Sequence, residues 1–251
     1  MWRSVIPHVC GLGRCIALDL IGMGRSEKPT LGYRFADHAR YVDAAIESLG
    51  LERLVLVSHD WGSTLAFHYA RRHETNVRAL AFMECILQPF PGWETFPAPV
   101  AELFRSFRTP QVGHELVLRR NVFIEEILPA GVMRPLSEEE LSRYRDPFPD
   151  EPSRVPLLRW PNEIPVAGEP ADVAEEISAC WDWLQETPLP KLLLHASPGA
   201  LIPPPAVELA QAKLRELQTV PLGAGIHHLH EDHPHAIGLA LARWLESLPA
   251  S

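Results

Sequence analysis

Apolar runs of strand length alternate with longer helical patterns toward both ends of the chain. The apolar runs cover residues 14–18, 53–58, 79–83, 191–196 and, more weakly, 218–222. Apolar residues at helical spacing cover residues 37–49, 62–72, 206–217 and 235–248. Strands that are apolar on both faces and alternate with helices are typical of a parallel sheet with helices on both sides.

The pattern changes between about residues 88 and 190. Prolines separate helical segments there, over residues 100–107, 113–128, 137–144 and 172–186, and no run has a convincing strand pattern. We therefore predict a core of residues 1–87 and 188–251 and an inserted helical cap of residues 88–187. Because open α/β sheets bind ligands beyond the carboxyl ends of their strands, a cap inserted there would cover the site.

Composition narrows the classes of partner. The 251 residues carry a formal net charge of -9, and 46% of them are hydrophobic. An acidic chain without basic blocks argues against nucleic acid and anionic membranes as partners. No apolar run reaches the length of about 18 residues that spans a bilayer, and residues 1–14 lack the layout of a signal peptide. The four cysteines show no CxxC spacing, so we expect reduced thiols in a cytoplasmic protein.

The sharpest local feature is the segment 55–63, VLVSHDWGS. An apolar strand runs into x-x-Asp-x-Gly and then into a helix of small residues, which is the layout of a nucleophile elbow with Asp60 in place of the usual Ser. A carboxylate needs no base before it attacks a carbon atom. The simpler interpretation of Asp60 is a helix N-cap, and Gly62 together with the residues described next favours the nucleophile.

A base and an acid follow in the expected chain order. His227 comes after the last predicted strand, where hydrolases with this kind of elbow carry their base. The loop 197–202 is the common place for the acid that orients the base, but it contains no carboxylate, so Glu84 at the end of the strand 79–83 is the alternative. Several more histidines near His227 raise the rival possibility of a metal-binding tract. Without HExxH spacing or cysteine ligands, we expect no metal.

These residues stand within a longer resemblance. From residue 14 to the end, the chain resembles the haloalkane dehalogenases, in particular the subfamily with an Asp-His-Glu triad. The matching stretches, in order, are DLIGMGRSEKP (19–29), VLVSHDWGS (55–63), AFME (81–84), ELFRSFRTP (102–110), PNEIPVAGEP (161–170), PKLLLHASPGALIPP (190–204) and HEDHPHAIG (230–238). The resemblance implies an α/β-hydrolase fold with a helical cap.

The resemblance also implies roles for particular residues. Asp60 would be the nucleophile, His227 the base, Glu84 its partner, and Trp61 a halide ligand through its indole N–H. The substrate cavity would be lined by apolar side chains that could equally be plain core residues: Phe104, Phe107, Phe123, Ile164 and Leu201. The implied reaction hydrolyses carbon–halogen bonds of small apolar substrates through an Asp60 ester, consumes water, releases halide ion, and needs no cofactor.

Other functions remain open at this point. An epoxide hydrolase would use the same nucleophile with two cap tyrosines, but residues 88–190 contain only Tyr144. A luciferase-like monooxygenase on this fold is a more distant rival. The chain could also be a non-catalytic remnant that binds apolar ligands. A dinucleotide site at Gly22 and Gly24 is disfavoured, because the third glycine of the fingerprint and its strand–helix context are lacking.

The chain departs from the family at its start. The family's H-G-N-P motif, whose Asn is the second halide ligand, is absent, and residues 1–7 match the helix that follows it. We therefore expect the family's first strands to be missing. One of them would lie in the sheet between the strands formed by residues 14–18 and 53–58. A start codon assigned too far downstream and a truncated product are the two explanations. Residues 1–251 are expected to have little or no dehalogenase activity and to be poorly stable or aggregation-prone beside an upstream-extended form.

Overall fold

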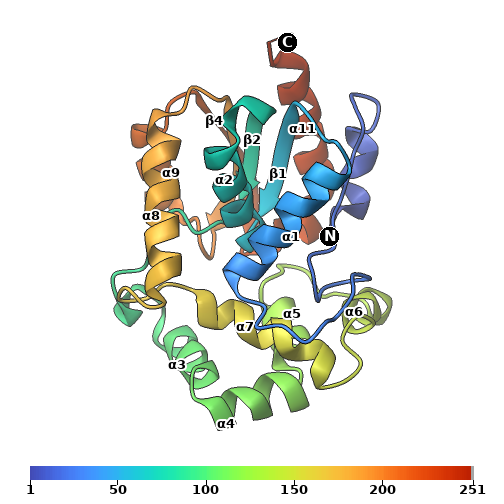
Figure 1. Cartoon of the computed structure of the whole chain (residues 1–251), viewed down its shortest axis with the longest axis vertical. Coiled ribbons are helices and arrows are strands. Elements are labelled where there is room, and N and C mark those ends of the chain that lie inside the picture. The colour runs from blue at the N-terminus through green and yellow to red at the C-terminus, as the bar shows by residue number, and fades with distance from the viewer. Residues whose placement is uncertain (250–251) are drawn as a thin grey trace.

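The computed structural model describes residues 1–249 and contains one sheet of four parallel strands. The strands are β1 (Leu54–His59), β2 (Val77–Met83), β3 (Lys191–Pro198) and β4 (Leu217–Gly225), in the spatial order β1-β2-β3-β4. In their register Val57 lies opposite Ala81 and Phe82 opposite Leu193, so the carboxyl ends of the strands lie side by side (Figure 1). These are the four strands predicted from residue 53 onward.

The sheet has helices on both faces, as expected for strands that are apolar on both sides. Along β2, Leu80 and Phe82 belong to one apolar cluster, whereas Ala79, Ala81 and Met83 belong to the other. The first cluster includes side chains from α1 (Phe35–Ser48), α2 (Trp61–Arg72), α8 (Ala171–Glu186) and α9 (Pro204–Lys213). The second includes side chains from α11 (Pro234–Ser247) and, at the N-terminus, Trp2 of the turn η1 (Trp2–Ser4) together with Val5 and Val9, which flank the turn η2 (Ile6–His8).

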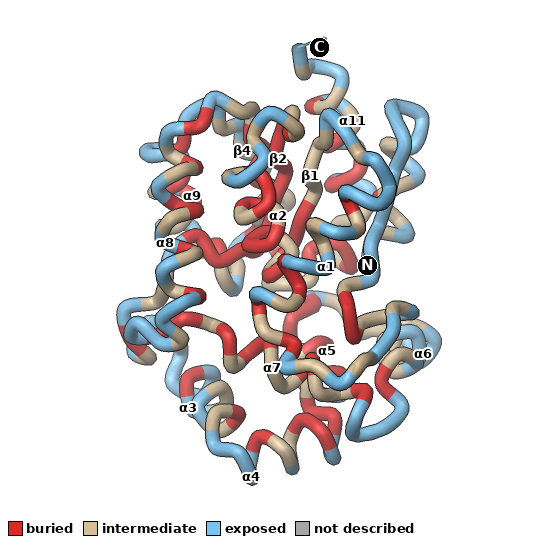
Figure 2. Tube along the Cα trace, viewed as in Figure 1, coloured by how far each residue is buried: buried red, intermediate tan, exposed pale blue. Residues whose placement is uncertain are grey.

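The predicted strand over residues 14–18 is wrong. This segment has no regular secondary structure, and Ile16 and Leu18 are exposed. A strand forms only where a neighbour satisfies its backbone hydrogen bonds, and within residues 1–249 β1 pairs with β2 alone. The first four residues of β1 are accordingly only half-buried, whereas β2 is almost entirely buried (Figure 2).

A helical region (residues 88–170) follows β2 and lies beyond the carboxyl end of the sheet (Figure 1). Its helices are α3 (Ala98–Phe107), α4 (Pro110–Gly113), the π-helical turns η5 (His114–Arg119) and η6 (Phe123–Ile127), α5 (Leu128–Ala130), α6 (Glu138–Arg145) and α7 (Val155–Glu163). The helix expected over 113–128 is broken because Asn121 has a φ of 55°. Three further short 3₁₀ turns are η3 (Glu74–Asn76), η4 (Trp93–Thr95) and η7 (Pro152–Arg154).

The expected insertion over residues 88–187 divides into two parts. Its last helix, α8, packs on the core, where Cys180, Trp181 and Leu184 join the same apolar cluster as the inner face of α2. The remaining helices also contact the core, through apolar side chains such as Trp160 and through a buried carboxylate. Glu163 accepts hydrogen bonds from the backbone N–H of Phe35 and from Arg34, each at 3.0 Å.

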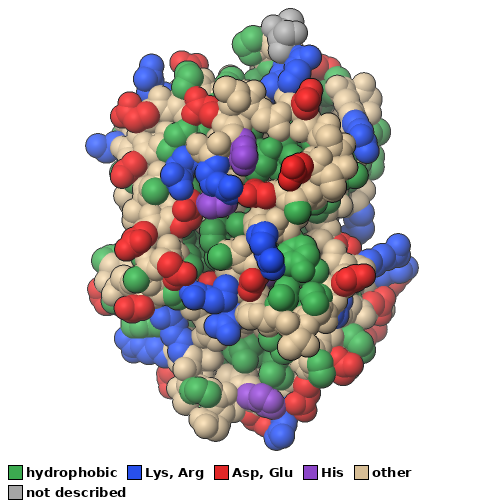
Figure 3. Space-filling model, in the orientation of Figure 1, with side chains coloured by type: hydrophobic (Ala, Val, Ile, Leu, Met, Phe, Trp, Pro, Cys, Tyr) green, Lys and Arg blue, Asp and Glu red, His purple; other side chains and the backbone are tan. Residues whose placement is uncertain are grey.

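The surface carries both signs of charge. Acidic and basic side chains are interspersed on the face shown in Figure 3, with no large area of one sign. No helix within residues 1–249 is long and apolar enough to cross a membrane.

Candidate active site

Asp60 occupies a strained turn between β1 and α2. Its φ of 52° and ψ of -132° lie outside the regions favoured by residues other than glycine. The turn is held from the neighbouring strand, because the Asp60 N–H donates to the carbonyl oxygen of Glu84 at 2.9 Å. A non-glycine residue held in such a conformation by its surroundings is typical of a functional position. The geometry matches the nucleophile elbow predicted from the sequence.

Glu84 follows β2 directly and is fully buried. Its carboxylate accepts hydrogen bonds from three successive backbone N–H groups, of Ala200 at 2.9 Å, Leu201 at 2.8 Å and Ile202 at 3.4 Å. These donors belong to the loop after β3, which has no carboxylate of its own. A buried charge is tolerated when hydrogen bonds replace its water, and this loop supplies them.

His227 lies between the two carboxylates. Its Nδ1 is 3.3 Å from Glu84 Oε2, and its Nε2 is 3.8 Å from Asp60 Oδ2. The helical region fixes the backbone of this loop, because the N–H groups of His227 and His228 both donate to the carbonyl oxygen of Gly131, at 3.0 and 2.9 Å. The three residues expected to carry the chemistry thus come together from three separate loops at the carboxyl ends of the strands.

The two carboxylates and the imidazole shift one another's pKa values. Burial alone would lower the pKa of His227, but hydrogen bonds to Asp60 and Glu84 and their negative charges outweigh it and raise the pKa to about 9. Burial alone would raise the pKa of Asp60, but His227, His59 and the backbone N–H of Trp61 outweigh it and lower the pKa. Asp60 is therefore an anion at neutral pH, as a carboxylate nucleophile must be.

Trp61 follows Asp60 at the start of α2 and is buried in an apolar cluster. Its ring stacks on Trp160 of α7 with centroids 4.8 Å apart and lies 6.2 Å from Phe35. Its indole Nε1 makes no hydrogen bond to another group of residues 1–249 that the structure records. Ile164 and Leu201, two of the expected cavity residues, pack against this same cluster. Both therefore belong to the same apolar neighbourhood as Trp61.

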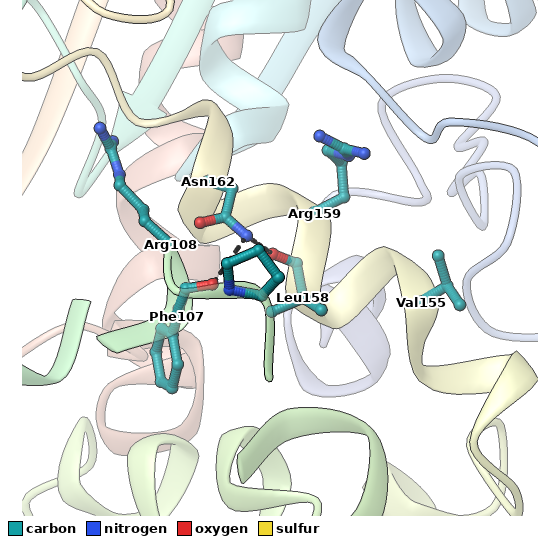
Figure 4. Close-up of a pocket in the computed structure, with 7 residues that line it drawn as sticks. Phe107, Arg108, Val155, Leu158, Arg159 and Asn162 are labelled. Atoms are coloured by element: carbon teal, nitrogen blue, oxygen red, sulfur yellow. Dashed lines mark hydrogen bonds between the residues drawn. The ribbon is translucent and has the colours of Figure 1, made fainter. Parts of the chain in front are cut away.

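The other three expected cavity residues lie elsewhere. Phe104, Phe107 and Phe123 pack on one another inside the helical region, with ring centroids 5.6 and 5.9 Å apart along the series. Phe107 also lines an open cavity of about 400 Å³ between α3 and α7 (Figure 4). Asn162 bridges its walls by donating to the carbonyl oxygens of Phe107 and Leu158. None of the seven lining residues is Asp60, Glu84 or His227.

Sequence analysis missed several residues that position the site. Gly199 has a φ of +67°, and a Cβ there would come within 2.5 Å of the Ile202 carbonyl oxygen and 3.1 Å of Glu84 Oε1. The sequence showed that Gly199 follows a predicted strand, but it could not show that Gly199 contacts Glu84. His59 lies one residue beyond the predicted strand 53–58 and was given no role, yet its Nε2 donates to the His227 carbonyl oxygen at 2.9 Å. Nothing in the sequence indicated that Gly131, which lies in the predicted cap, would contact the loop of His227.

Comparison with known proteins gives matches over nearly the whole chain. The alpha/beta hydrolase fold model matches residues 1–234. A haloalkane dehalogenase from Mesorhizobium japonicum is 50% identical over 247 residues, which cover 98% of this chain and 80% of that protein. Another, from Bradyrhizobium diazoefficiens, is 46% identical, with 100% of this chain and 84% of that protein covered.

A solved structure gives the same result in three dimensions. The crystal structure of a haloalkane dehalogenase from Bradyrhizobium elkani superposes with a TM-score of 0.96 at 46% identity, covering 98% of this chain and 85% of that one. Identity at this level over nearly the whole chain, together with the fold, establishes the family. The chain belongs to the haloalkane dehalogenases of the α/β-hydrolase fold.

Proposed function

We propose that this chain hydrolyses carbon–halogen bonds of small haloalkanes to an alcohol and a halide ion, with Asp60 as nucleophile, His227 as base and Glu84 as the partner of the base. The observation that carries the proposal is the position of His227, with Nδ1 on the buried Glu84 and Nε2 facing Asp60. One imidazole between two carboxylates can serve two successive steps, and the reaction needs no cofactor.

In the first step, a carboxylate oxygen of Asp60 attacks the carbon that bears the halogen. A C–O ester bond forms, the C–X bond breaks, and the halide leaves with the bonding electron pair. The indole N–H of Trp61 would donate to the departing halide, because it is the neighbouring donor without a protein acceptor. A fixed donor aimed at a developing charge lowers the barrier, since it needs no reorganisation.

In the second step, His227 Nε2 takes a proton from water, and the resulting hydroxide attacks the Asp60 carbonyl carbon. The bond between the Asp60 carbonyl carbon and the ester oxygen breaks, and the alcohol leaves with the proton returned by His227. Asp60 is left as a carboxylic acid, and its proton passes to solvent, which restores the carboxylate and balances the released halide. Ester formation neutralises Asp60 and so removes one of the two charges that raise the pKa of His227. The base therefore becomes available in the intermediate, where it is needed, while Glu84 stabilises the imidazolium.

An epoxide hydrolase is disfavoured by the state of Tyr144. That mechanism needs tyrosine hydroxyls free to donate to the epoxide oxygen. The hydroxyl of Tyr144 instead donates to Glu231 Oε1 at 2.5 Å. Burial and this carboxylate raise the pKa of Tyr144, so it is a poor acid.

We further propose that the helical region acts as the cap over the site, with Ile164 and Leu201 lining the substrate path beside Trp61. The free cysteines, of which Cys10 and Cys15 are exposed, fit a reducing compartment such as the cytoplasm. The partners are then a small apolar haloalkane, water and the released halide.

The test separates the two steps. The purified chain is mixed with an excess of a short 1-bromoalkane, and bromide release and intact protein mass are followed together. The unaltered chain is expected to release more bromide than Asp60→Asn, however slowly, and His227→Gln is expected to accumulate protein heavier by one alkyl group, because ester formation proceeds without the base. Asp60→Asn is the matched control and should show neither adduct nor turnover.

Two results would contradict the proposal. One is an unaltered, folded chain that yields neither bromide nor adduct across a panel of chloro-, bromo- and iodoalkanes. The other is His227→Gln protein that turns over at the unaltered rate with no adduct.

A further inference from the structure

Four histidine rings gather behind the proposed base. His59 comes from the end of β1, and His227, His228 and His230 come from the loop after β4 and the short helix α10 (Leu229–Asp232). The ring centroids of His59 lie 4.7 Å from His227, 5.8 Å from His228 and 5.1 Å from His230. The mechanism proposed above uses only His227, so three imidazoles at this place have no assigned role.

Three of these rings present nitrogen atoms to one another. One ring nitrogen each of His59, His227 and His228 lie within 4.8 Å of one another. Imidazole nitrogen binds Zn²⁺ at about 2.0–2.1 Å, so a shift of the rings by about 1 Å would let all three reach one ion. The side chain of His228 makes no hydrogen bond that the structure records within residues 1–249, which leaves it free to make that shift.

Hydrogen bonds hold the rings of His59 and His227 in the way that the rings of metal-binding histidines are usually held. The Nε2–H of His59 donates to the His227 carbonyl oxygen, and Glu84 holds Nδ1 of His227. His59 is therefore left with one nitrogen lone pair, and His227 offers one once it gives up the proton that it holds between Asp60 and Glu84. Metal-bound histidines almost always donate their other N–H to a carbonyl or a carboxylate in this way.

The fourth ring supplies an independent sign that the cluster is incomplete. His230 is 2% exposed, and neither of its ring nitrogens has a hydrogen-bond partner. It stands beside His59 and His228, with its centroid 5.6 Å from that of His228. A buried polar group without a partner is costly, and a water bound to an ion among its neighbours is one way to satisfy it.

From these contacts we propose that His59, His227 and His228 form a binding site for one divalent cation of the Zn²⁺ class, and that the bound ion silences the enzyme by occupying the base. Three imidazoles with an open fourth position are a ligand set that Zn²⁺ accepts, and binding would release to solvent the proton that His227 carries between the two carboxylates. The ion coordinates the lone pair with which His227 would take a proton from water. Attack by Asp60 needs no base, so a metal-loaded enzyme would form the ester and stop there.

The binding part of this proposal stands without any assumption about the reaction, whereas the trapping part rests on the proposed function. Binding is measured by calorimetric titration of the chelator-treated chain with ZnCl₂ at neutral pH. His228→Gln removes one ligand and should weaken the affinity at least about 10–100-fold, the loss typical even of a residue that only supports a ligand.

His235→Gln is the matched control. His235 is a nearby exposed histidine outside the cluster, and its Nδ1 lies 3.0 Å from His8 Nε2, so these two could hold zinc at the surface. The proposal expects His235→Gln to keep the site. It is overturned if His228→Gln binds as tightly as the unaltered chain, or if His235→Gln alone abolishes binding. Visible absorption of Co²⁺ bound to the unaltered chain gives a second measurement that needs no variant, and an octahedral spectrum of aqueous Co²⁺ would also overturn the site.

The trapping part is tested with zinc-loaded and zinc-free chain and an excess of a short 1-bromoalkane. We expect zinc to stop steady bromide release, to leave one alkyl group on the protein, and to be reversed by a chelator. A zinc-loaded protein that stays unalkylated would refute trapping while leaving the binding site in place. A zinc-free protein that releases no bromide would instead count against the proposed function, and the calorimetric result would be unaffected.

Discussion

The site at the ends of the strands and the helical region hold charge in opposite ways. At the site, the carboxylate of Glu84 is fully buried and is surrounded by three backbone N–H groups and His227. In the helical region, Arg119 bridges Glu115 and Glu151 at 3.3 and 3.5 Å, but all three side chains are about half exposed. Both are networks of opposite charges, and only the first is isolated from water.

This difference shows which part of the molecule has to be rigid. A buried charge is stable only if fixed donors are in place before it ionises, so the strands and their loops must fold to one geometry. An exposed pair is replaced by water at little cost, so the helical region can change its surface freely. The proposed chemistry is therefore tied to the sheet and its loops, whereas the exposed ion pairs of the helical region can be exchanged at little cost.

The largest expected effect is at Glu84. Glu84→Gln keeps the shape, but it removes the charge that the N–H groups of 200–202 and His227 face. We expect a loss of about 3–5 kcal/mol in the free energy of unfolding, since one partner of a buried pair is removed. Bromide release should also fall, by about 10⁴-fold if the orientation of the base is lost as in other triads. Urea unfolding and initial rates measure the two effects, and a variant as stable and active as the unaltered chain would remove Glu84 from the site.

The second prediction concerns pH. The folded pKa of His227 is about 9, above its ordinary value near 6.5, so the imidazolium stabilises the fold fully below about pH 6.5 and this contribution is lost as the pH rises through about 9. The stability difference between the unaltered chain and His227→Gln should therefore shrink over that interval. Urea unfolding of both proteins across the pH range tests this, and a constant difference would show that the two carboxylates do not hold a proton on His227.

A smaller effect is expected at Gly199. Gly199 and Gly168 both have positive φ, of 67° and 83°, but only a Cβ at Gly199 would meet other atoms, at 2.5 Å from the Ile202 carbonyl oxygen. Gly168→Ala should cost about 1–2 kcal/mol for the backbone conformation alone. Gly199→Ala should cost more and also slow bromide release, because the loop that holds Glu84 must move. Equal losses of stability with unchanged rates would show that this loop is not part of the site.

The smallest effect is expected in the helical region. Arg119→Ala removes both ion pairs of that side chain and should change the free energy of unfolding by less than about 1 kcal/mol, since exposed pairs are screened by water and salt. The catalytic rate should stay within about two-fold. Thermal unfolding at low and high salt measures the stability. A loss as large as that of Glu84→Gln would break the contrast between the two regions.

Local patterns in the sequence were sufficient for the elements that bury a face. Four of the five predicted strands and most of the predicted helices are present, because apolar periodicity reports which side of an element is covered. The tight turn at Asp60 could be predicted as well, because the strand, the turn and the small-residue helix are consecutive in the chain. His227 followed from its order after the last strand.

Other features were decided only by the tertiary structure. Residues 14–18 have the composition of a strand, but no neighbour satisfies their backbone groups, so they do not form one. The sequence showed that the loop 197–202 has no carboxylate, but it could not show that its N–H groups face Glu84, which is more than a hundred residues away. The same holds for His59, which lies beside His227 only once the sheet is formed. Hydrogen-bond partners that are distant in the chain leave no local periodicity, so only the assembled fold determines them.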